Sequence, residues 1–282
     1  MSFPLQTLES KYILKQVIGK GAQSLVYWGL VKSDESLVAI KQFHESKMND
    51  RVADHEVSIL KTLSAPGHYN IMKIQEAFID NNTRYLVTEY YNGMNLKRAA
   101  KKLHLLNSIS DYQFYLLDLL RDLLSALAYI HGHGIVHSDI KYTNIQVVNE
   151  YNLLRPILID FGLSFKQGSY HHNNIVGTPK YIAPELWQCF RNKIDRADIA
   201  KHVTTNVDIW ALGICFYGLV YDTEVWPKEL HKNFSKLSAY ITGQKQLFIK
   251  SSKNKRLNLL LSHMLQYDPN KRWSAQRLLE IQ

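Results

Sequence analysis

The stretch "IVHSDIKYTN" (residues 135–144) combines an acid, a base and an amide over a few positions, directly after a long segment with an apolar stripe. Asp139 can accept a proton, Lys141 can neutralise a transferring phosphate, and Asn144 can ligate a metal through its amide oxygen. We therefore interpret this stretch as a candidate catalytic loop. Ser138, which directly precedes the candidate base, raises the question of what a small hydroxyl group does there.

The next chemical motif along the chain is "LIDFGLS" (residues 158–164). Asp160 follows an apolar run that predicts a short strand over residues 156–159, and a glycine comes two positions later. A carboxylate at the end of a strand beside a glycine is suited to hold Mg2+. We expect Asn144 and Asp160 to be the metal ligands.

A pair of glycines lies near the N-terminus, in "IGKGAQSLV" (residues 18–26). Gly19 and Gly21 fall between two predicted strands, where the absence of Cβ atoms lets the backbone approach a phosphate. Ser24 stands where the third glycine of a G-x-G-x-x-G loop would be. Taken alone, this pattern is more typical of an ordinary hairpin turn than of a nucleotide site.

A charged pair is predicted in the same part of the chain. Lys41 lies on the strand predicted from "SLVAIKQF" (residues 36–43), and Glu56 lies within the apolar stripe of a helix predicted over residues 50–63. A buried carboxylate needs a partner, because an unpaired buried charge is costly. We expect Lys41 to pair with Glu56; the alternative is a half-exposed glutamate and a surface lysine.

The fold class predicted from these patterns is α+β. Ser110 with Gln113 predicts a capping box that opens a long helix, and residues 205–221 predict a very apolar one. The chain has no internal repeat, and its character changes from strands to helices near residues 89–95. The predicted strands of the first part are residues 12–19, 24–31, 36–43, 71–79 and 84–91.

The motifs resemble those of eukaryotic-type serine/threonine protein kinases, in the order of that family, from about Tyr12 to Leu279. "GTPKYIAPE" (residues 177–185) resembles the end of the activation segment, and "DIWALG" (residues 208–213) resembles the helix beneath it. The resemblance implies a bilobal kinase fold, with a small β-rich N-lobe that has one main helix and a larger, mostly helical C-lobe. The kinase domain would cover residues 12–280, with the N-lobe at about 12–90 and the C-lobe at about 95–280.

The resemblance also implies catalytic roles. Lys41 would hold the α- and β-phosphates of ATP while paired with Glu56. Asp139 would orient the substrate hydroxyl and accept its proton, and Lys141 would steady the γ-phosphate. Lys141 and Thr178 resemble the serine/threonine branch of the family, so we expect phosphoserine and phosphothreonine as products.

The cofactors implied are ATP and Mg2+, with Mn2+ as an alternative ion held by Asn144 and Asp160. Thr88 resembles the gatekeeper, and the backbone of the residues after it would contact the adenine. Apolar side chains would cover one face of the adenine, and Gln146 would lie at the opposite face. The nucleotide-binding set implied is Ile18, Gly19, Gly21, Val26, Ala39, Lys41, Thr88, Glu89, Tyr91 and Gln146.

Several matched residues are predicted to be architectural. Asp208 is a lone acid in a very apolar helix, and we expect it to cap N–H groups of a loop. His137 and Phe161 are predicted to pack in the core. Glu185 and Arg272 are predicted to form a structural ion pair.

The chain departs from the family at Ser24, at Gln146, where a leucine is usual, and at Ser138, which replaces the arginine of His-Arg-Asp. Serine offers neither the bidentate clamp nor the charge that would hold a phosphorylated activation segment. We therefore predict activity without phosphorylation of that segment. The segment still contains the hydroxyl residues Ser164, Ser169, Tyr170 and Thr178, with Lys166, His171 and His172 as weak phosphate partners.

A long connection, residues 186–207, is either a partner surface or a tolerated insertion.

The net charge of +9 favours acidic partners, although most of it is spread along the chain. Two denser basic clusters, Lys97, Arg98, Lys101 and Lys102, then Lys245, Lys250, Lys253, Lys255 and Arg256, are either solvated faces or docking surfaces for acidic protein or lipid. The basic clusters show no regular interleaving with aromatic residues, so nothing in them suggests binding to nucleic acid. We expect no membrane span, no secretory signal, and a reducing, cytoplasmic location, with Cys189 and Cys215 as packing groups.

The function expected is phosphoryl transfer from ATP to protein hydroxyls. The alternative is a pseudokinase, which retains the fold as a scaffold or allosteric partner. The departures at Ser24, Ser138 and Gln146 favour this alternative, whereas the complete set of catalytic residues disfavours it. A small-molecule kinase is a third reading, disfavoured by the segment over residues 177–185.

Overall fold

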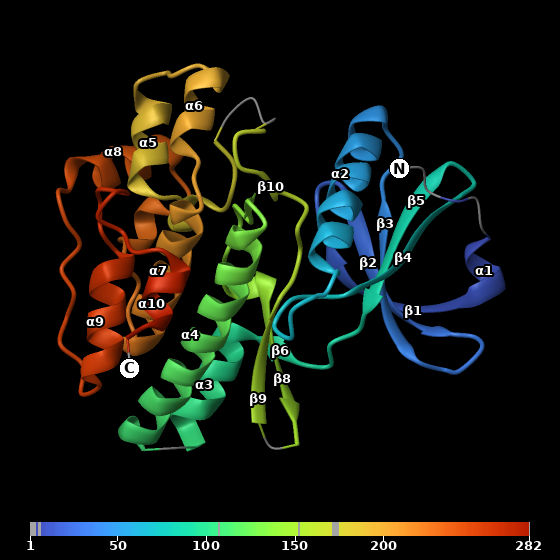
Figure 1. Cartoon of the computed structure of the whole chain (residues 1–282), viewed down its shortest axis with the longest axis horizontal. Helices are drawn as coiled ribbons and strands as arrows, with labels where there is room; N and C mark the ends of the chain where they lie inside the picture. Colours follow the sequence, from blue (N-terminus) through green and yellow to red (C-terminus); the bar gives the residue numbers. More distant parts are fainter. Residues whose placement is uncertain (1–3, 5–6, 107, 152, 171–174, 282) are drawn as a thin grey trace. The chain divides into compact units, whose positions relative to one another are not determined.

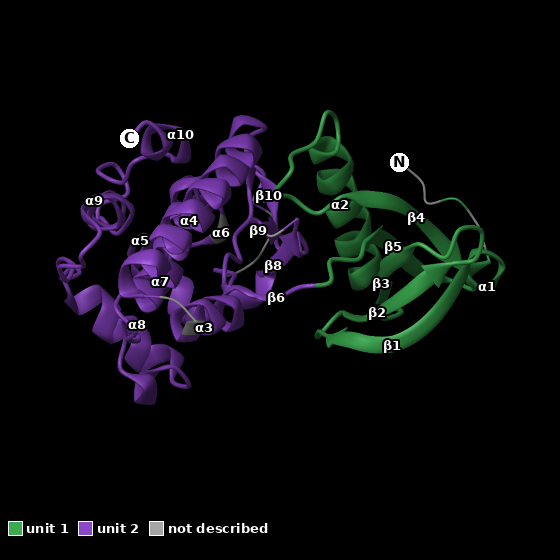
Figure 2. Ribbon diagram, turned by 90° about the horizontal axis from the view of Figure 1, so that it is seen from below, with its two compact units in different colours: residues 1–92 green, residues 93–282 purple. Residues whose placement is uncertain are grey.

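The computed structural model describes residues 4, 7–106, 108–151, 153–170 and 175–281; His171 and His172, considered above as phosphate partners, lie outside the described residues. The chain divides into two compact units, Met1–Asn92 and Gly93–Gln282 (Figures 1 and 2). The first unit is built on a β-sheet and the second is mainly helical (Figure 1). The predicted α+β fold is therefore confirmed.

The sheet of the first unit has antiparallel strands in the order β1-β2-β3-β5-β4. Its hairpin between β4 and β5 turns through Asn81 and Asn82, which adopt left-handed φ angles of 45° and 63°, a region that asparagine tolerates better than most residues. The strand predicted from Ile71 begins three residues later. The bounds are β1 Tyr12–Lys20, β2 Ser24–Val31, β3 Leu37–Phe43, β4 Ile74–Asp80 and β5 Thr83–Glu89.

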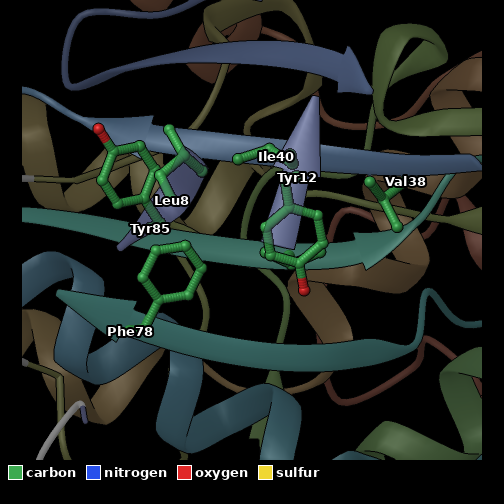
Figure 3. Packing of buried hydrophobic residues seen from close by; sticks show 7 residues of the cluster. Leu8, Tyr12, Val38, Ile40, Phe78 and Tyr85 are labelled. Atoms are coloured by element: carbon green, nitrogen blue, oxygen red, sulfur yellow. The ribbon is translucent and has the colours of Figure 1, made fainter. Parts of the chain in front are cut away.

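The two faces of this sheet differ in chemistry, because alternate residues of a strand point to opposite sides. Val38 and Ile40 of β3 belong to an apolar cluster that also contains Leu8 of the short helix α1 (Leu8–Lys11). Within this cluster the rings of Phe78 and Tyr85 stack with centroids 5.2 Å apart (Figure 3). Lys41, the next residue after Ile40, therefore points to the opposite face.

Helix α2 (Lys47–Leu63) packs on β3, β4 and β5. It begins three residues before the predicted start, because the side chain of Ser46 accepts a hydrogen bond from the Asn49 N–H and caps the first turn. The apolar stripe of α2 is buried, and Glu56 is buried with it. The stripe thus carries Glu56 toward the face of β3 on which Lys41 lies.

The second unit is organised by long helices. The longest, α4, is capped by Ser108, which accepts from the Asp111 N–H, so the capping box predicted at Ser110 was wrong by two residues. Gln113 is instead buried and accepts from the Asn254 N–H at 2.8 Å. The helices are α3 Leu96–Leu106, α4 Ile109–Gly132, α5 Pro184–Arg191, α6 Arg196–His202, α7 Asn206–Val220, α8 Phe234–Gly243, α9 Lys255–Met264 and α10 Ala275–Leu279, with 3-10 turns η1 Tyr142–Asn144, η2 Pro179–Tyr181 and η3 Lys228–Leu230.

Small sheets complete the second unit. Strand β8 (Ile145–Glu150) pairs with β6 (Met94–Asn95) and β9 (Leu153–Leu158), and β7 (Ile135–Val136) pairs with β10 (Phe165–Lys166). Together β7, η1 and β8 fix both ends of the stretch over residues 135–144.

The connection over residues 186–207 is packed rather than loose. Helices α5 and α6 contact each other, and Cys189 and Ile199 within them are buried. Cys189 and Cys215 are both free, and burial raises the pKa of each thiol, as fits packing groups. Within the described part of the chain, no helix combines the length and apolar character that crossing a membrane needs.

Candidate active site

The carboxylate of Asp139 is the centre of a dense hydrogen-bond network. It is 7% exposed, and each of its oxygens accepts two hydrogen bonds. Oδ1 accepts from the Thr178 N–H at 3.0 Å and from the Thr178 hydroxyl at 2.8 Å. Oδ2 accepts from the Lys141 ammonium at 2.6 Å and from the Asn144 amide at 3.1 Å. The carboxylate is therefore held in one orientation.

Lys141 and Asn144 reinforce this arrangement. The Lys141 ammonium also donates to the Thr178 hydroxyl at 3.1 Å, which links the catalytic loop to the segment after Gly177. The Asn144 amide nitrogen also donates to the Asp139 carbonyl at 2.9 Å. Both of these Asn144 bonds use the nitrogen, so they leave the amide oxygen for a metal.

The predicted metal ligands are brought together by β8 and β9. Ile145 pairs with Leu158, and the Ile159 N–H donates to the Asn144 carbonyl at 2.9 Å. Asp160 follows Ile159 with a left-handed φ of 63°. An amide oxygen and a carboxylate fit Mg2+, which takes oxygen ligands and usually keeps several waters or phosphate oxygens as well. The residues present therefore fit the ion that the sequence implied.

Asp208 of α7 holds the backbone of the catalytic loop, as predicted. It is fully buried and accepts from the His137 and Ser138 N–H groups, each at 2.9 Å. Asp208 Oδ2, which accepts from the His137 N–H, also lies 2.9 Å from His131 Nε2. Ser138 itself adopts a left-handed φ of 67°, which these bonds stabilise.

Gly177 lies against the carbonyl of Ser138. A Cβ atom at Gly177 would come within 2.7 Å of that oxygen, and the residue has a φ of +109°. Only glycine suits this position. Because Gly177 lies this close to Ser138, the next residue, Thr178, lies within hydrogen-bond distance of Asp139.

His137 and Phe161 pack in the core, as predicted. Both are fully buried, with ring centroids 4.8 Å apart. His137 Nδ1 accepts from the Asp139 N–H at 3.3 Å, while Nε2 faces the Ile159 carbonyl at 3.2 Å and therefore carries the proton. His137 thus connects the candidate base to the strand end that precedes the candidate metal ligand.

Neutral contacts anchor the start of the activation segment. The buried Ser164 hydroxyl donates to the His137 carbonyl at 3.2 Å, and β10 pairs with β7. Tyr170 is 6% exposed, with its ring edge-on to Phe165 at 5.0 Å. Ser164 and Tyr170, counted above as hydroxyls for phosphorylation, are therefore enclosed by packing, whereas Ser169 is exposed.

The Glu185–Arg272 ion pair is present as predicted. Arg272 donates to both carboxylate oxygens of Glu185, at 2.8 and 3.1 Å, and both side chains are buried. Arg272 also donates to the carbonyls of Asn206 and Gln266. This buried pair ties α5 to the first residue of α7 and to the segment between α9 and α10.

In the first unit, Lys41 pairs with Glu56. The Lys41 ammonium lies 2.9 and 2.8 Å from the two carboxylate oxygens, and Glu56 is 1% exposed. Register places Lys41 opposite Val26 on β2 and Leu86 on β5. The predicted pair, rather than a surface lysine beside a half-exposed glutamate, is therefore present.

The glycines of the predicted phosphate loop are not required by the packing of the protein itself. The nearest atoms to a Cβ built at Gly19 and Gly21 are 3.4 and 3.7 Å away, which are ordinary contact distances. Neither glycine has a left-handed φ. This fits the interpretation that the two glycines serve the approach of a ligand rather than the packing of the turn.

The other residues of the predicted nucleotide set are divided between the units. Ile18 is exposed, while Val26 and Ala39 are half-buried on neighbouring strands. Thr88 is buried on β5, and the Tyr91 hydroxyl donates to Glu89 at 3.0 Å. Gln146 is half-buried on β8, in the second unit.

Sequence reasoning missed the direct contact of Thr178 with the candidate base. It used Thr178 as an indicator of the acceptor residue and as one of the hydroxyl residues of the activation segment. It also missed a cluster of Lys97, Lys180 and Glu224 in the second unit, in which Glu224 lies 3.5 Å from each lysine. The residues come from separate segments of the chain, so no local spacing could have revealed this cluster.

The comparisons identify the family. Residues 12–282 match the family described as "Protein kinase domain". Similar curated proteins include a calcium/calmodulin-dependent protein kinase type 1 of Macrobrachium nipponense, 31% identical over 77% of this chain and 58% of that protein. A probable myosin light chain kinase of Dictyostelium discoideum is 29% identical over 97% of this chain and 66% of that protein.

CBL-interacting protein kinase 25 of Oryza sativa subsp. japonica is 28% identical over 99% of this chain and 52% of that protein. The chain thus spans about half to two thirds of the length of these relatives. The match covers both units and every motif from the glycine turn to Arg272. The chain therefore belongs to the protein kinase domain family, of the eukaryotic type that its motifs resemble.

Proposed function

We propose that the chain transfers the γ-phosphoryl group of ATP to serine and threonine hydroxyls of protein substrates. The observation that carries this proposal is the Asp139 carboxylate, fixed by Lys141, Asn144 and Thr178. A group that takes a proton from a substrate must be held in a fixed orientation, and this carboxylate is. The names of the relatives, all protein kinases, support the same reaction class.

In the proposed reaction the oxygen of the acceptor hydroxyl forms a bond to the γ-phosphorus. The bond from that phosphorus to the bridging oxygen of ADP breaks, and the hydroxyl proton passes to Asp139. The Thr178 hydroxyl, 2.8 Å from Oδ1, occupies a place from which a substrate hydroxyl would donate.

The charges on the phosphates need partners. Lys141 would steady the transferring group, and Lys41, oriented by Glu56, would hold the α- and β-phosphates. Mg2+, when bound, would neutralise charge that develops on the phosphate oxygens. Asn144 and Asp160 would hold it, and their oxygen donors suit Mn2+ as well.

The acceptor class rests on Lys141 and Thr178. The Lys141 ammonium donates to the Thr178 hydroxyl at 3.1 Å, and both side chains contact Asp139. The two residues that resemble the serine/threonine branch therefore lie together beside the proposed base. We expect phosphoamino-acid analysis of the products to give phosphoserine and phosphothreonine. Products dominated by phosphotyrosine would contradict this assignment.

The first test is a transfer assay with radiolabelled ATP on a mixed protein substrate. Asp139→Asn and Asp160→Asn should each lower the rate by a factor of about 100 or more, as expected for loss of a base or a metal ligand. Both keep the shape of the side chain, so the melting temperature serves as the control for folding. A wild-type rate in either variant would reject its role, and nucleotide binding without transfer in the wild-type protein would favour the pseudokinase alternative.

A further inference from the structure

Lys97, Lys180 and Glu224 form a charged cluster in the second unit. Glu224 lies 3.5 Å from the ammonium of each lysine, one through Oε1 and the other through Oε2. The Lys97 and Lys180 ammonium groups also lie 5.6 and 5.7 Å from the centre of the Tyr142 ring. We call these residues the lysine–glutamate cluster.

The cluster is joined to the candidate base by short stretches of chain. Lys180 is two residues after Thr178, and Tyr142 directly follows Lys141; both Thr178 and Lys141 contact Asp139. The Trp226 indole donates to the Lys180 carbonyl at 3.0 Å, which fixes the backbone there. A substrate segment with its hydroxyl at Asp139 would therefore have residues within a few positions of the cluster.

The carboxylate of Glu224 is already committed to the two lysines. Partial burial would raise the pKa of Glu224, but the charges of Lys180 and Lys97 outweigh this effect and lower that pKa. The cluster thus carries one more positive than negative charge. Each ammonium has three N–H donors, so it keeps donors for a second anion after contacting Glu224.

The neighbouring groove extends this positive character. It has a volume of about 1080 Å³, and its lining includes Lys97, Glu224 and two further exposed lysines, Lys101 and Lys228. Asp222 is the other acid that lines it. A basic side chain entering the groove would have to displace a lysine from Glu224 and face the remaining cations, whereas an acidic one would gain contacts with them.

We propose that this groove binds anionic side chains of the protein substrate, close to the hydroxyl that is phosphorylated. The proposal rests on the proposed function, because it names the substrate class of the same site. Aspartate, glutamate and phosphoserine share the chemistry that the lysines recognise. The acidic segment meets the groove at Lys97 and the adjoining part of the lysine–glutamate cluster at Lys180.

The test compares peptides that carry one serine acceptor flanked on both sides by glutamate, glutamine, arginine or phosphoserine. We expect kcat/KM to be at least fivefold higher for the glutamate peptide than for the glutamine peptide, mainly through a lower KM. The arginine peptide should be the poorest. The phosphoserine peptide shows whether a doubly charged anion is preferred over a carboxylate.

Lys97→Glu is the decisive variant, because Lys97 is 61% exposed and touches none of the proposed catalytic residues. It should abolish the preference for glutamate over glutamine and improve use of the arginine peptide. Lys97→Arg should retain the preference. Lys102→Glu, an equal charge change at an exposed position of the same helix that does not line the groove, should also retain it.

Binding of the labelled glutamate peptide, measured by fluorescence anisotropy, tests the groove independently of transfer. Weaker binding in Lys97→Glu than in Lys102→Glu supports the proposal even without catalysis. Equal binding in both, or a wild-type preference for the arginine peptide, overturns it. Failure of the proposed function would show differently, as absence of transfer to every peptide.

Discussion

At the scale of single residues, the site depends on backbone conformations that few residues adopt. Ser138 and Asp160 both have a left-handed φ, and they lie on either side of the candidate chemistry. Such conformations cost free energy and persist where surrounding bonds hold them. At Ser138 these bonds are the ones that the His137 and Ser138 N–H groups donate to Asp208. Two of the residues with this strained backbone therefore lie at the candidate base and at the candidate metal ligand.

Gly177→Ala tests this arrangement at its tightest point. The new Cβ would approach the Ser138 carbonyl to 2.7 Å at a φ of +109°, so Thr178 would be pushed from Asp139. We expect transfer to fall at least tenfold and the free energy of unfolding to fall by about 1–3 kcal/mol.

Gly168→Ala is the matched control for this substitution. Gly168 also has a positive φ, +82°, but a Cβ there would meet nothing within 4 Å. It should cost stability without lowering the rate comparably. Equal losses of activity in the two variants would show that the contact with Ser138 has no special role.

At the scale of elements, the sequence predicted the order of strands and helices but placed some ends wrongly. Apolar spacing located α2 and Glu56, because the pattern repeats over several turns. The capping box of α4 was misplaced because Ser108 and Ser110 both suit a cap, and the choice depends on tertiary contacts, including that of Gln113 with Asn254. Local pattern cannot distinguish such neighbours.

The same limit applies to the candidate site. Asp139, Asn144 and Asp160 could be assigned roles because their residue types and order are specific. The anchoring of the activation segment could not be predicted, since the bond from Ser164 to His137 and the packing of Tyr170 on Phe165 depend on the fold. These neutral contacts supply a physical reason for expecting order without a phosphate.

The activation segment should accordingly support activity without phosphorylation. Ser138 provides no charge to bind a phosphate, and the segment is held by β10–β7 pairing and buried side chains. Phosphatase treatment and Ser169→Ala should each change the transfer rate by less than threefold. A tenfold drop, about 1.4 kcal/mol in the barrier, would show that a phosphate contributes.

Tyr170 offers a sharper comparison within the same segment. Tyr170→Phe keeps the ring against Phe165, so activity should remain within threefold of the wild type. Tyr170→Ala removes the ring and should lower both activity and melting temperature. If Tyr170→Phe were as damaging as Tyr170→Ala, the hydroxyl rather than the packing would be the important group.

At the scale of the whole molecule, each unit contains one ion pair that the sequence predicted, and the glutamate of each pair is buried. Lys41–Glu56 lies in the first unit and Glu185–Arg272 in the second. Their expected roles differ, because Lys41 would contact phosphate whereas Arg272 contacts only protein groups among the described residues. Stability and activity should therefore separate when the two pairs are altered.

Arg272→Ala should destabilise the second unit by roughly 3–5 kcal/mol, because Glu185 would remain as a buried charge without its partner. The carbonyls of Asn206 and Gln266 would lose donors at the same time. Urea unfolding followed by fluorescence gives the measurement. Lys201→Ala, which removes the exposed Lys201–Asp198 pair on α6, is the control and should leave the unfolding curve unchanged. Because the cost arises from the stranded carboxylate, Glu185→Gln combined with Arg272→Ala should recover part of the loss, and a double variant no more stable than Arg272→Ala would refute that cause.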